Sequence, residues 1–469
     1  ARQAAAEPFT PVATFMAHHQ GMSIVALANV LLGGVVQRWG MANAHLQAVA
    51  SLLHERVPRE IPNLYAPPAA LLPQTLQQRR PGLLREVRPG MAAVEPTHLL
   101  SNGRYHVSLR PNGAGRSRWG LLGLTRWRDD ALRDAYGSFF YLRRLGGRAP
   151  LFSITQHPAP DPAADYQSTY HADRVCLRAS WPDLQIEMTV WVSPEDDIEF
   201  RQIELRNLGE QALELELISA FEPTLTDPRA DESHPAFTNL FMRAEWRAEQ
   251  QALLFRRTPR LPSEPALQLA HFLADSDAVS LQGIRIQTDR AGWLGRNRAR
   301  SQPLALFEPP VEGPLDTGLD PVCAISLSLR IAPQAKAQLT FATAASEDGG
   351  TLHAVIDKYR QPSHVQRASL MSATLTGIRL RSLALSPDNF AAVQTFSTAL
   401  LLSLTRSDGG AASPCDRRLL WRFGISGDRP LLLVRISMPQ GLGLLRSLAQ
   451  ALRLWAWGGL ECDLVVVNA

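Results

Sequence analysis

The sequence predicts a mainly β protein with α segments, built around a large antiparallel β-sandwich. Apolar and polar residues alternate in several runs between residues 97 and 365, including LQIEMTVWV (184–192), IEFRQIELRNL (198–208) and LELELISAF (213–221). This period of two is typical of half-buried strands. Turn signals such as SPEDD (193–197) separate the runs, and helical periodicity is scarce among them. Many strands joined by short turns favour a sandwich of antiparallel sheets.

The composition is that of an ordinary globular protein with more than one domain. A chain of 469 residues, 45% hydrophobic and 20% charged, is too long for one core and suggests two or three domains. The formal net charge is only +4 and the arginines are spread among acids, so nucleic-acid binding is disfavoured. The four cysteines, Cys176, Cys323, Cys415 and Cys462, form no CxxC pair, which argues against a zinc site or a disulfide framework.

The N-terminal region shows no secretory signal and no apolar run that predicts a membrane span. Residues 14–36 come nearest, but polar residues such as Asn29 interrupt them. Because the sequence starts at Ala1 rather than at a methionine, we expect it to be a fragment of a longer protein.

Residues 12–57 are predicted to form two helices. Thr14 is the expected cap of the first helix, and Gly33 with Gly34 is expected to end it. The second helix is predicted over residues 41–57, stopping before Pro58.

Three polar residues of the first predicted helix, His18, His19 and Gln20, need an explanation. Adjacent helix positions point about 100° apart, so the two histidines do not easily chelate one metal. Two interpretations remain open. One is that the cluster lines a sugar cleft in a larger protein, and the other is that the histidines are hydrogen-bonded structural residues.

Residues 58–96 are predicted to form an extended, irregular linker, because proline recurs there and removes backbone donors. The stretch 97–143 follows and reads as paired strands. Tyr105 and Val107 alternate with polar residues, and PNGAG (111–115) provides a turn.

Aromatic and charged residues crowd together directly after that turn. Trp119, Arg126, Trp127 and Asp129 are candidate sugar contacts, because rings offer stacking faces and charged groups offer hydrogen bonds. Packing and ion pairing between strands are the simpler interpretations of the same residues. The acids of 195–197 are read as a solvated turn.

Residues 366–408 become helical, with SPDN (386–389) supplying a Ser or Asp cap before the second helix. Asp428 lies in GISGDRP (424–430), where two glycines allow the backbone to approach a ligand closely. A tight turn capped by Asp428 is the simpler interpretation.

Several stretches of the sequence resemble a known family. HLLSNGRYHVSL (98–109) and LTRWRDDALRDAYGSFFYLR (124–143) resemble the start of the sandwich domain of cellobiose and chitobiose phosphorylases, which recurs near the C-terminus of cyclic β-1,2-glucan synthases. FMAHHQGMSIVALANVLL (15–32) resembles the last helices of the glucoamylase-like domain of those synthases, and WRFGISGDRPLLLVRIS (421–437) the entry to their barrel. The family's Asn-Ala-Gly-Gly-Gly turn is replaced by Pro-Asn-Gly-Ala-Gly (111–115).

The resemblance implies a glycoside phosphorylase of the glycosyltransferase family 36 type and a fold in five segments. These are the C-terminal helices of a glucoamylase-like domain (1–57), a Pro-rich linker (58–96), a carbohydrate-binding β super-sandwich (97–365), a helical linker (366–420) and the start of a truncated (α/α)6 barrel (421–469).

The same resemblance sets expectations about catalysis. Inverting phosphorolysis requires one general acid, since phosphate is already anionic. In the family this acid is an Asp in a Gly-Asp-Trp-Asn-Asp-like motif, which this sequence lacks, and Gly427–Asp428 is not followed by Trp-Asn. We therefore assign no catalytic residue, metal or cofactor, expect the chain to be inactive alone, and consider inorganic phosphate a co-substrate only of the intact parent.

The partners implied are β-glucan oligosaccharides and the rest of the parent polypeptide, and a homodimer is left open. The resemblance places this portion, as a soluble part, on the cytoplasmic side of a parent tethered to the bacterial inner membrane.

Two functional hypotheses follow from the residues and the resemblance. In the first, the chain is a portion of a cyclic β-1,2-glucan synthase-like protein that acts in β-glucan biosynthesis, with phosphorylase-like control of glucan length. In the second, it is a non-catalytic carbohydrate-binding or scaffold module. A stand-alone disaccharide phosphorylase is disfavoured, because such enzymes begin with the sandwich and this chain has a helical segment before Pro58.

Overall fold

The computed structural model describes residues 17–43, 83–92, 95–128, 136–146, 150–259, 264–277, 280–405, 416, 418–436 and 441–468. The chain divides into two compact units, Ala1–Thr75 with Ala411–Gly427, and Leu76–Gly410 with Asp428–Ala469. Each unit is described by itself.

The first unit contains a bent helical pair and one short helix, α10 (Arg418–Trp421). Helix α1 (Ala17–Leu31) ends at Gly33 and Gly34, as predicted, and both glycines adopt positive φ. Helix α2 (Val35–Met41) begins directly after them, whereas the sequence predicted the next helix only from residue 41. Residue 14 and nearly all of that second predicted helix lie outside the described residues.

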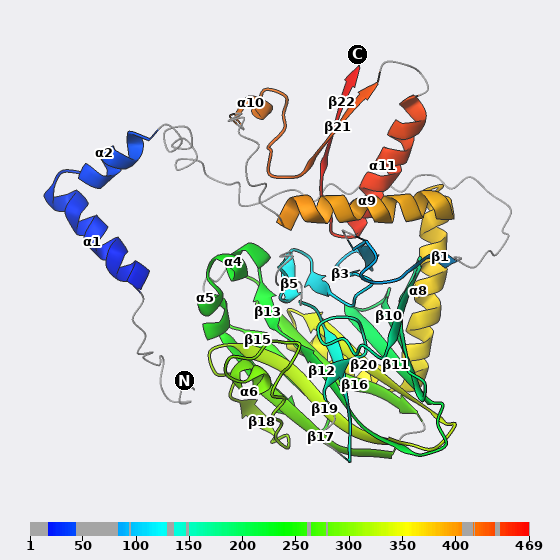
Figure 1. The fold of residues 1–469 in the computed structure, drawn as a ribbon. Helices are drawn as coiled ribbons and strands as arrows, with labels where there is room; N and C mark the ends of the chain where they lie inside the picture. Colours follow the sequence, from blue (N-terminus) through cyan, green and yellow to red (C-terminus); the bar gives the residue numbers. More distant parts are fainter. Residues whose placement is uncertain are drawn as a thin grey trace. The chain divides into compact units, whose positions relative to one another are not determined.

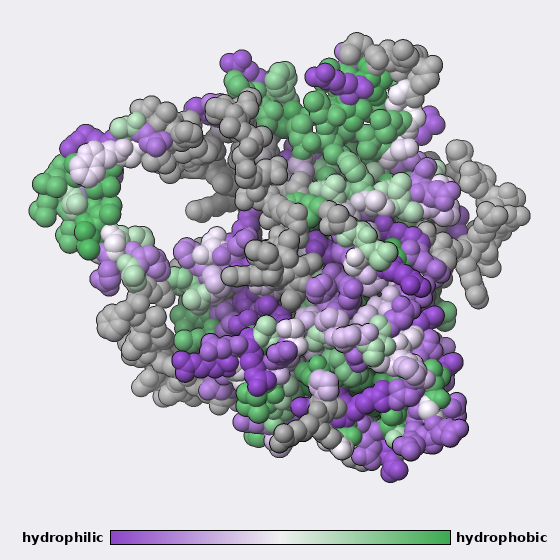
Figure 2. Space-filling view, viewed as in Figure 1, coloured by the Kyte–Doolittle hydropathy of each residue, from purple (hydrophilic) through white to green (hydrophobic). Residues whose placement is uncertain are grey.

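Helices α1 and α2 meet at an angle of 101° and leave their apolar side chains largely exposed (Figure 2). Asn29 fixes the bend, because its Oδ1 accepts hydrogen bonds from the backbone N–H groups of Val36 and Gln37 at 3.0 and 3.3 Å. Among the described helices none alone has the length and apolar content of a membrane span, although this bent pair does when its two halves are taken together.

The second unit is built on a ten-stranded antiparallel sheet, which confirms the mainly β fold class (Figure 1). Its strands in spatial order are β1 (Leu83–Val87), β8 (Asp165–His171), β9 (Val175–Ser180), β10 (Leu184–Val192), β11 (Ile198–Asn207), β20 (Lys336–Ser346), β16 (Gln268–Asp277), β15 (Ala252–Arg257), β14 (Met242–Arg247) and β18 (Gly313–Leu315).

Two five-stranded sheets pack on this large sheet. One has the order β17 (Ser280–Asp289), β19 (Pro321–Ile331), β12 (Leu213–Phe221), β6 (Phe139–Arg144) and β7 (Phe152–Ser153). The other, here called the small sheet, has the order β13 (Pro223–Thr226), β5 (Leu122–Thr125), β4 (Gly115–Trp119), β3 (Tyr105–Leu109) and β2 (His98–Ser101).

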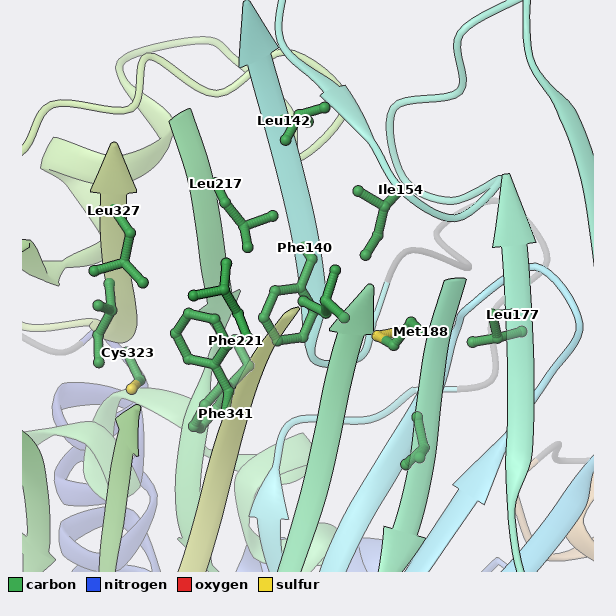
Figure 3. Packing of buried hydrophobic residues seen from close by; sticks show 14 of the residues in the cluster. Phe140, Leu142, Ile154, Leu177, Met188, Leu217, Phe221, Cys323, Leu327 and Phe341 are labelled. Atoms are coloured by element: carbon green, nitrogen blue, oxygen red, sulfur yellow. The ribbon is translucent and has the colours of Figure 1, made fainter. Parts of the chain in front are cut away.

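The main core lies between the large sheet and its two partners. Phe140 and Leu217 from one partner sheet meet Met188 and Phe341 from the large sheet (Figure 3). Within β11 the sequence predicted that Ile203 and Leu205 would face opposite to their polar neighbours. That alternation is confirmed, because both residues are buried while Gln202, Glu204 and Arg206 are partly or fully exposed. Burial of such apolar side chains contributes about 1.5–3 kcal/mol each.

Two features of the second unit differ from the sequence-based expectation. Strand β1 falls inside the predicted irregular linker, because its backbone pairs with β8 over residues 83–87. Short helices that the sequence did not predict interrupt the mostly β region, namely α4 (Pro228–Ser233), α5 (Pro235–Leu240), α6 (Arg290–Leu294) and α7 (Gly349–Tyr359). Helix α7 and the following α8 (Pro362–Ser382) cover the outer face of the large sheet through a second apolar cluster.

The C-terminal helices lie against the small sheet. Helix α9 (Pro387–Thr405) starts after Ser386, whose Oγ accepts a hydrogen bond from the N–H of Asn389, so the predicted Ser cap is confirmed. Helix α11 (Gly441–Trp457) connects β21 (Leu431–Ile436) to β22 (Asp463–Asn468), and these two strands pair in parallel. The assignment of this segment to an (α/α)6 barrel stays a prediction.

Candidate functional site

The outer face of the small sheet gathers basic and aromatic residues of the 97–128 stretch. Directly paired residues of an antiparallel sheet share one face. His106 of β3 pairs with Arg118 of β4, and Arg116 lies two positions before Arg118. Just beyond β3 and β5, the Arg110 guanidinium lies 5.0 Å from the centre of the Trp127 ring. These five residues are called the basic face.

His106 is a buried neutral histidine at the edge of the basic face. Its Nδ1 lies 2.9 Å from Ser101 Oγ, and that hydroxyl donates its single proton to the Trp457 carbonyl at 2.8 Å. The imidazole Nδ1–H must therefore be the donor to Ser101, which leaves Nε2 unprotonated. Burial, followed by the charges of Arg118 and Arg116, lowers the pKa of His106 to about 4.

The basic face is partly covered by the C-terminal segment. Arg118 Nη1 lies 3.5 Å from the carbonyl oxygen of Gly459, and burial lowers the pKa of Arg118. A Cβ on Gly459 would lie 2.8 Å from the His106 ring, and its φ is +72°. Both facts require glycine at position 459, because a side chain would collide with the imidazole and strain the backbone.

Trp119, predicted as a sugar contact, lies on the opposite, inner face of the small sheet. Its Nε1 donates a hydrogen bond to Asp197 Oδ2 at 2.7 Å, and the Arg104 guanidinium lies 5.5 Å from its ring centre. Asp197 is 9% exposed, and Asp196 accepts a hydrogen bond from Tyr359 at 2.8 Å. The interpretation of residues 195–197 as a solvated turn is therefore wrong at Asp196 and Asp197.

Arg126, another predicted sugar contact, lies at the centre of a buried ion network. Its guanidinium hydrogen-bonds to Glu222 at 2.7 Å, Asp231 at 3.0 Å and Asn239 at 3.0 Å. Burial by itself would lower the pKa of Arg126, but the carboxylates reverse this and raise it. Asp320, Arg290 and Arg300 complete the network, so three arginines face three carboxylates.

The positive and negative charges within this network compensate one another. Burial works to raise the pKa of Glu222, but Arg300, Arg126 and Arg290 lower it to about 2. The cavity beside Arg126 and Tyr136 has a volume of about 20 Å³, which is room for about one water molecule. This cluster is therefore suited to holding β5, β13, α4 and α5 together rather than to admitting a sugar ring.

The remaining predicted site residues are dispersed. Trp127 is half-buried on the basic face, whereas Asp129 lies outside the described residues. Asp428 follows Gly427, which has a φ of +74°, as the predicted turn requires. His18, His19 and Gln20 are exposed on α1, and the two imidazole centres lie 4.2 Å apart. Across the described parts of the chain, no group of three His, Cys, Asp or Glu side chains has the geometry of a metal site.

The sequence analysis missed a pocket between α8, α9, α11 and β2. Its polar lining includes Ser372, Thr376 and Arg379 of α8, and Trp457 of α11 forms one wall. These residues lie in segments that were assigned as a linker and as barrel helices. No periodic signal could find them, because the pocket forms only where three helices meet β2, β10 and the turn after β8.

Comparison with known proteins adds the following relationships. Residues 85–362, more than half of the chain, match the model of the family described as "Glycosyl hydrolase 94, supersandwich domain". The chain is 31% identical over 470 residues to the cyclic beta-(1,2)-glucan synthase NdvB of Rhizobium meliloti (strain 1021), a match that covers 97% of this chain and 16% of that protein. The chain thus spans about a sixth of the length of this relative.

Two solved structures match the chain at low similarity. A bacterial glucoamylase complexed with acarbose has a TM-score of 0.39 and 7% identity, over 66% of this chain and 42% of its own. A putative kojibiose phosphorylase from human microbiome has a TM-score of 0.37 and 7% identity, over 66% of this chain and 38% of its own. The strand pairing and the family match together establish the fold class. Because the family model matches residues 85–362, the chain belongs to the glycosyl hydrolase 94 supersandwich domain family.

Proposed function

We propose that this chain is the sandwich-bearing portion of a cyclic β-1,2-glucan synthase-like protein that acts in β-glucan biosynthesis. The observation that carries the proposal is the 31% identity to a cyclic beta-(1,2)-glucan synthase over 97% of the chain. The family match over residues 85–362 supports the same carbohydrate context. In the intact protein, the phosphorylase-like part controls glucan length by phosphorolysis, as the resemblance to disaccharide phosphorylases implies.

Within this proposal, the sandwich contributes to glucan binding through its basic face. Trp127 offers an aromatic surface, and Arg116 with Arg118 offers donors that suit sugar hydroxyls. His106 presents an unprotonated Nε2, which accepts a hydrogen bond from a hydroxyl. Trp119 and Arg126 are positioning residues in this scheme, because their polar groups bind Asp197 and Glu222 inside the protein.

Calorimetric titration of the chain with linear and cyclic β-1,2-glucans tests the binding claim. Cellobiose and laminarin oligosaccharides are the linkage controls. We expect a saturable signal for the β-1,2 series alone, weakened by Trp127→Ala. Trp39→Ala is the matched control, since Trp39 is 70% exposed and lies on α2, in the other unit. A signal equal for all glucans, or one insensitive to Trp127→Ala, would contradict glucan recognition by this face.

A second candidate function, a non-catalytic scaffold, is favoured by how the C-terminal helices dock. Trp455 of α11 is 1% exposed and donates a hydrogen bond to Ser397 of α9 at 2.9 Å, while Gln394 of α9 bonds to both backbone groups of Leu99 in β2. The sandwich thus presents α9 and α11 in a fixed orientation. Absence of binding to every glucan, with an intact fold by circular dichroism, would favour this candidate.

A further inference from the structure

We infer that the pocket between α8, α9, α11 and β2 binds a small oxyanion such as phosphate, with the guanidinium of Arg379 as its principal donor. The pocket is separate from the basic face, and the inference does not depend on glucan binding. It is carried by an unpaired cation, by hydroxyl donors on the same helix face, and by a rigid aromatic wall.

Arg379 is half-buried and lacks a counter-ion among the described residues. None of the carboxylates there lies within salt-bridge distance of its guanidinium, and its contact is with the Trp457 ring, whose centre is 3.1 Å from Cζ. Burial is the cause that lowers the pKa of Arg379, to about 10, so it stays charged at neutral pH. Arg126, which is buried, has three carboxylates around it. A half-buried cation that lines a pocket without a counter-ion is partly desolvated, which points to a ligand that supplies negative charge.

Two hydroxyls stand beside the guanidinium. One face of α8 carries Ser372, Thr376 and Arg379, because these residues are four and three positions apart along the helix. All three line the pocket, and Ser372 is 8% exposed. Within the described chain, neither hydroxyl makes a hydrogen bond back to its own helix, unlike that of Thr374, which bonds to the Leu370 carbonyl at 3.0 Å. The donors are therefore available to an acceptor in the pocket.

Trp457 forms a rigid wall that fixes the position of Arg379. Its Nε1 donates to the Ser101 carbonyl at 3.2 Å, and its own carbonyl accepts from Ser101 Oγ at 2.8 Å. Gly103 contacts the ring so closely that an added Cβ would lie 2.6 Å from it. The guanidinium covers one face of this indole ring.

The size and charge of the pocket suit a small anion. Its volume of about 50 Å³ is room for a few water molecules, and Arg379 is the cation in its lining. Asp173 also lines the pocket, but its carboxylate is paired with Arg174 at 2.7 Å. A planar guanidinium binds two oxygens of a phosphate or carboxylate at once, and this geometry is its strongest mode of recognition.

The test is a thermal-unfolding titration of the whole chain with sodium phosphate, in chloride buffer of matched ionic strength. Binding to the folded state raises Tm with ligand concentration. Sodium sulfate and sodium acetate are parallel arms that separate tetrahedral from planar oxyanions. We expect a saturable rise for phosphate beyond that of chloride. No such rise would overturn the inference.

Variants of α8 make the test specific. Arg379→Gln should weaken phosphate binding about 10- to 100-fold, since it removes charged hydrogen bonds. Thr376→Val should weaken it by a smaller factor. Arg381→Gln, at an exposed position of the same helix, is the matched control and should leave binding unchanged. Equal phosphate affinity in Arg379→Gln and the parent chain would overturn the site.

A measurement without ligand separates this role from a purely structural one. In phosphate-free buffer Arg379→Gln should leave Tm unchanged or raise it, because a half-buried charge without a counter-ion is removed. A clear drop in Tm together with unchanged phosphate affinity would instead show that the stacking of Arg379 on Trp457 is only structural, and would contradict an anion site.

Discussion

Trp119 and Asp197 join the small sheet to the large sheet through one partly buried hydrogen bond, from indole Nε1 to Oδ2 at 2.7 Å. Trp119 ends β4, and Asp197 closes the turn between β10 and β11. Asn102, before β3, donates to the same carboxylate at 3.1 Å. One carboxylate thus orders two hairpin ends that are far apart in the sequence.

Replacing Trp119 by phenylalanine should destabilise the protein by about 1–3 kcal/mol, because Asp197 then loses a donor in a buried position. Urea denaturation followed by circular dichroism measures this change. Trp39→Phe, on an exposed ring, should change the free energy of unfolding by less than about 0.5 kcal/mol. Equal values for the two variants would show that the hydrogen bond is not a structural link.

Replacing Arg126 by methionine should cost about 3–5 kcal/mol, because the buried carboxylate of Asp231 then loses its arginine partner and Glu222 keeps only Arg290 and Arg300. Arg178→Met is the matched control. The Arg178–Glu187 pair lies on the surface, with side chains 47% and 37% exposed, so its loss should cost less than about 1 kcal/mol. Guanidinium denaturation of both variants compares them, and a small effect at Arg126 would contradict the buried network.

The stability of the second unit should fall between pH 6.5 and 4. Burial is the largest cause that lowers the pKa of His98 and His271 to about 3 and of His106 to about 4. Between these values and 6.5 the unfolded chain binds more protons than the native one, so stability is complete above pH 6.5 and is lost as pH falls.

Each of these imidazoles lowers the free energy of unfolding by up to about 1.4 kcal/mol for each pH unit within that window. Unfolding by urea at a series of pH values measures the slope. His106→Gln should reduce the slope, whereas His353→Gln, which leaves those three buried histidines in place, should keep it. A flat profile above pH 4 would contradict neutral buried histidines.

Replacing Trp455 by alanine should loosen α9 and α11 and cost about 3–5 kcal/mol in the stability of this layer, since it leaves a cavity and removes the bond to Ser397. Hydrogen exchange of residues 441–457 should accelerate while the ten-stranded sheet stays protected. Leu444→Ala, at a side chain 54% exposed, is the control and should leave exchange unchanged. Uniform acceleration in both variants would contradict a locally docked helix.

The fold class followed from the sequence because strand periodicity is a local property. The alternation in IEFRQIELRNL (198–208) alone predicted which side of β11 is buried, and the Ser386 cap and the two-glycine helix end were equally local. Strand β1 escaped prediction, because prolines surround a segment that becomes a strand only by pairing with β8, about eighty residues later.

The site was predicted less well than the fold. The sequence singled out one crowded stretch that contains Trp119, Arg126 and Trp127. In the structure, the side chains of Trp119 and Arg126 point into the protein, whereas Trp127 lies on the outer face of the small sheet. Residue type and spacing could indicate that these side chains make specific contacts, but could not indicate which residues they contact. The Arg379 pocket carried no signal in the sequence, since its walls come from six segments that are far apart in the chain.

The sequence by itself determined most of the strands, their turns and the ends of some helices, because steric preference and hydrophobic period act between near neighbours in the chain. Only the tertiary structure decided the sheet order, the burial of Arg126 among carboxylates up to 194 residues away, and the isolation of Arg379 from any described carboxylate. The physical reason is that charge pairing and burial depend on distances in space, and long-range packing alone sets those distances.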